Sequence, residues 1–165
     1  MIPSWQAMFK HGGRTVGSPL ASEVIVRGDL TGRATLARRD ELRADFNAGL
    51  ENLLGPQVQP TQIVAIRAFD AGRVSQPEGI VVLSESAIAW LRASEGPIGN
   101  RCGVRAIALP FKRVVAVELS QRLLRGLFIA HASAQTRMEV PYSILDEALF
   151  AGLARSVLAS IDCSV

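Results

Sequence analysis

The stretch that decides the fold reads Glu78-Gly79-Ile80-Val81-Val82-Leu83-Ser84-Glu85-Ser86-Ala87-Ile88-Ala89-Trp90. A short polar turn at 84–86 separates two apolar runs, and this pattern predicts a β-hairpin with strands over 79–83 and 87–93. Similar short β-type runs follow one another to about residue 140. The hairpin is therefore expected to belong to a larger antiparallel sheet.

Further strands are predicted on both sides of this hairpin. Short β-type runs bounded by turn residues predict strands over 62–69, 104–109, 112–119, 126–132 and 136–140, and the run at 112–119 is dense in β-branched residues. The connections at 70–78, 94–103 and 120–125 are polar or rich in Gly and Pro. Together with the hairpin, these runs predict seven strands.

A single amphipathic helix closes the sequence. Its apolar stripe repeats mostly every four residues and consists of Leu145, Leu149, Leu153, Val157 and Ile161. Ser143 is the predicted N-cap, and Asp146 three residues later resembles the second half of a capping box. Strands that give way to one helix predict a mainly β (α+β) protein with a helix-capped sheet, not an alternating α/β enzyme.

A second helix is predicted before the first strand, over 36–54. Thr35 is its expected N-cap and Gly55-Pro56 its stop. Its apolar stripe is expected to face the core of its own domain, not a partner, and consists of Leu42, Phe46, Leu50, Leu53 and Leu54. We expect a partly flexible segment over 1–34, a helical extension over 35–55, and the main domain over 58–162.

The order of seven short strands and one C-terminal helix resembles a bacterial pleckstrin-homology-like domain. The hairpin at 78–90 looks like the hairpin of that family, with an aromatic residue in its second strand. A second signature, a small apolar strand that ends in Pro before a β-branched strand, is matched by Ala108-Leu109-Pro110-Phe111-Lys112-Arg113-Val114-Val115-Ala116-Val117-Glu118. The chain departs from the family in its longer loop at 94–103 and in Ser84-Glu85-Ser86-Ala87, where a Thr-Asn/Asp-x-Arg turn is usual.

The resemblance implies a seven-stranded barrel of two nearly orthogonal antiparallel sheets, with the helix at one open end and ligand-binding loops at the other. It also implies a binding or scaffolding module, although a shared fold does not fix a function. It gives no support for phosphoinositide specificity, because the first predicted hairpin offers only Arg67 and Arg73 as basic residues.

Composition excludes several classes of protein. The chain has 165 residues, 48% of them hydrophobic, and a net charge of +3, which is an ordinary globular balance and no indication of nucleic-acid binding. Cys102, Cys163, His11 and His131 are scattered, so we expect no metal site and no cofactor, and free thiols are favoured over a disulfide. GxGxxG, P-loop, HExxH and GxSxG motifs are absent, and we expect a protein that is not an enzyme.

Two segments are candidate binding sites. A basic segment over 101–125 could bind phosphate or carboxylate groups, and it contains Arg101, Arg105, Lys112, Arg113, Arg122 and Arg125. The alternative is a set of solvated charges on different faces, because strand side chains alternate. The loop at 121–125 adds Leu123 and Leu124, which could enter a membrane interface or a partner groove. The alternative is that these two leucines pack against neighbouring strands.

These observations favour two functional hypotheses, with a small enzyme built on the barrel as a third alternative. The first is a non-enzymatic module that mediates interaction with a protein partner or self-association. The second is peripheral binding to an anionic membrane through the basic segment at 101–125. No segment approaches the length of a membrane span and no signal peptide is indicated, so the expected location is the cytoplasm, including the inner membrane face.

Overall fold

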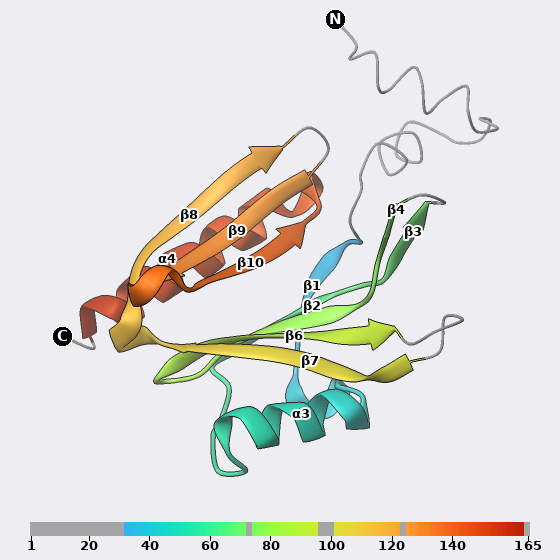
Figure 1. The fold of residues 1–165 in the computed structure, drawn as a ribbon, viewed down its shortest axis with the longest axis horizontal. Helices are drawn as coiled ribbons and strands as arrows, with labels where there is room; N and C mark the ends of the chain where they lie inside the picture. Colours follow the sequence, from blue (N-terminus) through green and yellow to red (C-terminus); the bar gives the residue numbers. More distant parts are fainter. Residues whose placement is uncertain (1–31, 72–73, 96–100, 123–124, 164–165) are drawn as a thin grey trace, which may run out of the picture.

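The structure is a computed structural model of the chain, and it describes residues 32–71, 74–95, 101–122 and 125–163. Two antiparallel sheets dominate this part of the chain (Figure 1). The five-stranded sheet has the order β1-β2-β5-β6-β7, formed by Ala34–Ala37, Gln62–Ile66, Gly79–Leu83, Ala87–Glu95 and Arg101–Pro110. The three-stranded sheet has the order β10-β9-β8, formed by Arg137–Tyr142, Arg125–Ala132 and Val114–Arg122.

A two-stranded ribbon extends the five-stranded sheet at one end. It pairs β3 (Phe69–Ala71) with β4 (Val74–Gln76), between β2 and β5 in the chain. At the other end, a 3-10 turn η3 (Phe111–Arg113) leads from β7 into β8 and so from one sheet to the other. Figure 1 shows the two sheets meeting near this turn and separating toward the free tip of β6 and β7.

Strand β5 lies at the centre of the packing because both of its faces are buried. Val81 and Leu83 belong to the main core, which also contains residues of the three-stranded sheet and of α4 (Glu147–Cys163). The alternate residues Ile80 and Val82 belong to a second core beneath α3 (Ala44–Leu54). Because strand side chains alternate between faces, a strand that is covered on both faces must be apolar at every position. This explains the continuous apolar run of β5.

Helix α3 covers the outer face of the five-stranded sheet. Phe46 and Leu50 are buried there, and Leu42, Leu53 and Leu54 pack around them. The prediction of a core-facing stripe is therefore confirmed. The predicted helix over 36–54 is wrong at its beginning, because Ala34–Ala37 pairs with β2 as strand β1 and the α-helix starts only at Ala44.

Strand β1 is tied to the beginning of the C-terminal helix by a buried carboxylate. Asp146 accepts a hydrogen bond of 2.8 Å from the backbone N–H of Ala34 and bonds of 2.9–3.1 Å from the guanidinium of Arg33. Ser143 caps the turn as predicted and accepts a bond from the N–H of Leu145. The predicted capping box is wrong, because the Asp146 carboxylate binds Arg33 and the first N–H of β1 instead.

Other differences from the predicted strands are small. The predicted strand over 62–69 is divided into β2 and β3, and the predicted connection over 70–78 contains β4. The predicted connection over 120–125 is mostly strand, because β8 continues to Arg122 and β9 starts at Arg125. Residues 1–31, assigned to a partly flexible segment, lie outside the described residues, and the proposed domain limits stay a prediction.

Candidate functional site

The described side chains of the predicted basic segment do not all lie together. Arg105 lies in the middle of β7, whereas Lys112 and Arg113 lie in the η3 turn. At about 3.3 Å per residue, the turn is roughly 20 Å along the strand from Arg105. Arg125 begins β9 on the other sheet. The backbones of Arg101 and Arg122 lie in β7 and β8, but their side chains and the whole of Leu123 and Leu124 lie outside the described part of the chain.

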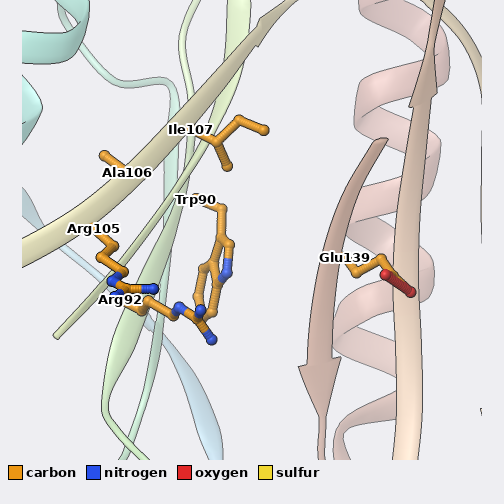
Figure 2. Close-up of a pocket in the computed structure, with 6 residues that line it drawn as sticks. All are labelled: Trp90, Arg92, Arg105, Ala106, Ile107 and Glu139. Atoms are coloured by element: carbon orange, nitrogen blue, oxygen red, sulfur yellow. The ribbon is translucent and has the colours of Figure 1, made fainter. Parts of the chain in front are cut away.

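One of these residues, Arg105, lines a pocket. The pocket has a volume of about 400 Å³, and we call it the arginine pocket; it is lined by Trp90, Arg92, Arg105, Ala106, Ile107 and Glu139. Figure 2 shows Arg92 and Arg105 beside Trp90 on the five-stranded sheet, with Glu139 across the space on the three-stranded sheet. Arg92 and Arg105 also line an adjoining hollow of about 190 Å³ next to Pro77.

The register of β6 and β7 explains why the core ends at this point. The facing pairs along the hairpin are Ile88 with Leu109, then Trp90 with Ile107, then Arg92 with Arg105. All of these residues are on the same face of the sheet, because they alternate along each strand. The first two pairs belong to or pack against the main core, and the third pair is exposed. The arginines therefore form the rim where the buried face meets solvent.

Gly79 makes room for the indole ring at the base of this rim. A Cβ atom at Gly79 would lie 2.5 Å from the Trp90 Cη2 atom, closer than any two carbon atoms can pack. Trp90 is only 7% exposed, so its ring lies mostly within the core and only its edge faces the pocket. The pocket therefore combines a fixed apolar wall with two long, cationic side chains.

The charge of this rim is not neutralised within the described residues. No ion pair involves Arg92 or Arg105 in that part of the chain, although the two face each other across neighbouring strands. Directly opposed like charges destabilise a sheet. Glu139, the acidic residue among the described lining of the pocket, forms an ion pair of 3.4 Å with Arg137. The arrangement thus offers guanidinium donors to an external anion.

Arg92 was not among the predicted site residues. It lies outside the basic segment at 101–125, and only the pairing of the two predicted strands brings it opposite Arg105. The sequence did contain the necessary signal, since a hairpin register between 87–93 and 104–109 places these two residues together.

The residues considered for chemistry are not among those that line the pocket. The Nε2 atom of His131 lies 3.1 Å from an oxygen of Glu118, linking β9 to β8 on a partly exposed face. Cys163 is a free, exposed thiol at the end of α4. Within the described ranges, no group of three or more His, Cys, Asp or Glu side chains could hold a metal ion. Nor does any helix in those ranges have the length and apolar character needed to cross a membrane.

Comparison with known proteins identifies the fold. No protein-family model matches the chain, and no curated protein does so. Among solved structures, the chain is similar to a DUF1696 family protein with a pleckstrin-homology domain from Shewanella loihica PV-4, with a TM-score of 0.50. The two sequences are 13% identical, and the match covers 79% of this chain and 98% of the other. The resemblance inferred from the hairpin and the closing helix is confirmed, and the chain has the fold of a bacterial pleckstrin-homology-like domain.

Proposed function

We propose that this chain is a non-enzymatic module that binds a protein partner, and that the arginine pocket receives an anionic group of that partner. A pleckstrin-homology-like fold suggests a binding module. The observation that supports the finer proposal is the facing pair Arg92 and Arg105, exposed at the rim of a 400 Å³ pocket with no ion pair in the described part of the chain.

An anion would stabilise this arrangement in two ways. Arginine presents its N–H donors in a planar fork that matches the two oxygens of a carboxylate or the oxygens of a phosphate. A bound anion would also offset the repulsion between the two facing guanidinium groups. A partner that inserts an acidic side chain would therefore gain more from this pocket than from isolated surface arginines.

The form of the site favours a discrete group over a flat anionic membrane. The pocket is concave, with a volume of about 400 Å³, so it can enclose a discrete anionic group more readily than it can contact a flat surface. Lys112 and Arg113 lie in the η3 turn after β7, roughly 20 Å along the strand from Arg105. These basic residues therefore do not form one compact cationic surface for a membrane. Membrane binding is accordingly the alternative against which the proposal is tested.

Trp90 provides the signal for the experiment. The sequence has two tryptophans, Trp5 and Trp90, so the Trp5→Phe variant reports on the pocket alone. Its fluorescence is recorded during titration with a blocked hexapeptide of alternating valine and glutamate. Parallel titrations use neutral phosphatidylcholine vesicles and vesicles that also contain anionic phosphatidylglycerol. Arg92→Glu combined with Arg105→Glu tests the site, and Lys112→Glu combined with Arg113→Glu in the η3 turn is the control with the same change of charge.

The proposal predicts a saturable fluorescence change with the acidic peptide, which the variant at Arg92 and Arg105 loses and the variant at Lys112 and Arg113 keeps. The change should weaken with salt, because charges near the surface are screened over about 8–10 Å at ordinary ionic strength. Binding to the anionic vesicles but not to the peptide would overturn the protein-binding proposal in favour of the membrane alternative. Peptide binding that survives the substitution of Arg92 and Arg105 would show that the arginine pocket is not the site.

A further inference from the structure

We infer that the arginine pocket and the outer edge of β7 form one docking site for an extended acidic segment of a protein partner, which joins the five-stranded sheet as an additional strand beside β7. This inference rests on the proposed function. It goes further in stating the conformation of the ligand, its point of attachment and its chemistry.

The first support is the position of β7 in the sheet. β7 ends the strand order β1-β2-β5-β6-β7, and no described strand pairs with its outer side. An edge strand presents unpaired backbone N–H and C=O groups, which are a template for pairing with another chain. Peptide recognition by addition of a strand to such an edge is a recurrent mode of binding.

The second support is the direction of the backbone groups in β7. The N–H of Phe111 donates to the C=O of Ser86 at 2.9 Å, which fixes the hydrogen-bonded register of the hairpin. In an antiparallel pair, hydrogen-bonded and non-hydrogen-bonded residue pairs alternate. Arg105 and Ile107 therefore bond to β6 through their backbones. The backbone groups of Ala106, which faces Leu91, point away from β6 toward the free edge.

The third support is that this edge and the two arginines share one surface. Ala106 lines the same pocket as Arg92 and Arg105. A strand added beside β7 would place every second side chain on the face that carries Arg105 and Ile107. Side chains directly opposite on neighbouring strands lie about 4.5–5.5 Å apart at Cβ, so an acidic residue opposite Arg105 would be within reach of its guanidinium group.

The combination selects the ligand. The outward N–H and C=O of Ala106 can form strand-type hydrogen bonds only with a peptide backbone, which lipid headgroups and small anions lack. A negatively charged group of the ligand would reduce the repulsion between Arg92 and Arg105, which face each other without an ion pair in the described residues. The Ile107 side chain and the edge of Trp90 provide an apolar wall for a neighbouring β-branched or aromatic side chain. The expected ligand is a segment that alternates acidic and apolar residues.

The test separates the backbone contribution from the charge contribution. The probe is the blocked hexapeptide of alternating valine and glutamate, compared with the same peptide methylated at every second backbone nitrogen on the pairing side. The protein is the full chain, with Ala106→Pro to remove the outward N–H and Ala106→Ser as the matched control. Circular dichroism and thermal unfolding of each variant check that the fold is kept.

Strand addition predicts that methylation of the peptide weakens binding by about tenfold or more, because several backbone hydrogen bonds are lost together. Ala106→Pro should weaken the unmodified peptide while Ala106→Ser does not. Equal affinities for the two peptides would overturn the strand-addition inference while leaving anion binding by the arginines intact. No binding of either peptide would contradict the proposed function itself. The peptide comparison decides the matter even if Ala106→Pro fails to fold.

Discussion

Replacing Asp146 with alanine should loosen strand β1 and lower the stability of the whole domain. The carboxylate is 6% exposed and accepts the backbone N–H of Ala34 at 2.8 Å. A hydrogen bond to a charged group contributes about 1.5–3 kcal/mol. The ion pair with Arg33 adds less than about 1 kcal/mol, because the Arg33 side chain is 51% exposed and screened by solvent.

The variant also removes the cost of burying a charge, so we expect a net loss of about 2 kcal/mol in the free energy of unfolding. For a chain of this size, 1 kcal/mol corresponds to about 2–4 °C in the melting temperature. Asp146→Ala should therefore melt about 4–8 °C below the parent protein in calorimetry, and a urea titration should show the loss in the free energy of unfolding.

Two further variants make this estimate specific. Arg33→Ala should cost less than about 1 kcal/mol. Asp162→Ala, at an exposed position in the last turn of α4, should change stability by less than about 0.5 kcal/mol. If Asp146→Ala were no more destabilising than Arg33→Ala, the bond to the backbone of β1 would contribute nothing, and the account of how β1 is held would be refuted.

Three other predictions follow from the packing. Burial raises the pKa of Tyr142 above its ordinary value, and the hydrogen bond from its hydroxyl to Glu147 raises it further. The unfolded chain therefore releases this proton at a lower pH than the folded chain, and the free energy of unfolding should fall as the pH rises past about 10. The Tyr142→Phe variant should lack this fall in urea titrations at different pH values. A Cβ atom at Gly126 would lie 2.2 Å from the Tyr142 ring, so Gly126→Ala should lower the free energy of unfolding by about 1–3 kcal/mol or more. In helix α4, a Cβ atom at Gly152 would lie 3.8 Å from its nearest atom. Gly152→Ala should therefore leave the free energy of unfolding unchanged or raise it in the same urea titration. A chain that starts at Pro56 lacks β1 and α3 and exposes the second core, so light scattering after size-exclusion chromatography should show aggregates, and a stable monomer would contradict the account.

Local patterns in the sequence were sufficient for most of the fold. The hairpin at 78–90 and the closing helix each combine a strong apolar period with recognisable turn or cap residues, and both are confirmed. Strand β1 escaped prediction because Ala34-Thr35-Leu36-Ala37 is too short to show a period of its own. Its pairing with β2 and its tie to Asp146 depend on residues that are distant in sequence.

The candidate site shows the same limit more sharply. Proximity in sequence grouped Arg105 with Lys112 and Arg113, which the structure separates along β7. The actual neighbour of Arg105 is Arg92, thirteen positions earlier in the chain and directly opposite in the hairpin. The alternation of side chains along a strand predicts which face of the sheet each charged residue occupies. Which charged residues lie opposite one another depends on the register between the strands. The pairing of strands, more than the density of basic residues, should guide the search for such sites.

The most direct test of the binding account is amide chemical-shift mapping of the full chain with the blocked hexapeptide of alternating valine and glutamate. The account predicts that the largest shifts occur at Arg92, Arg105, Ala106 and the indole N–H of Trp90, and that Arg92→Glu combined with Arg105→Glu abolishes them. Shifts centred on Lys112 in the η3 turn, or no shifts at peptide concentrations that saturate the fluorescence signal, would contradict it.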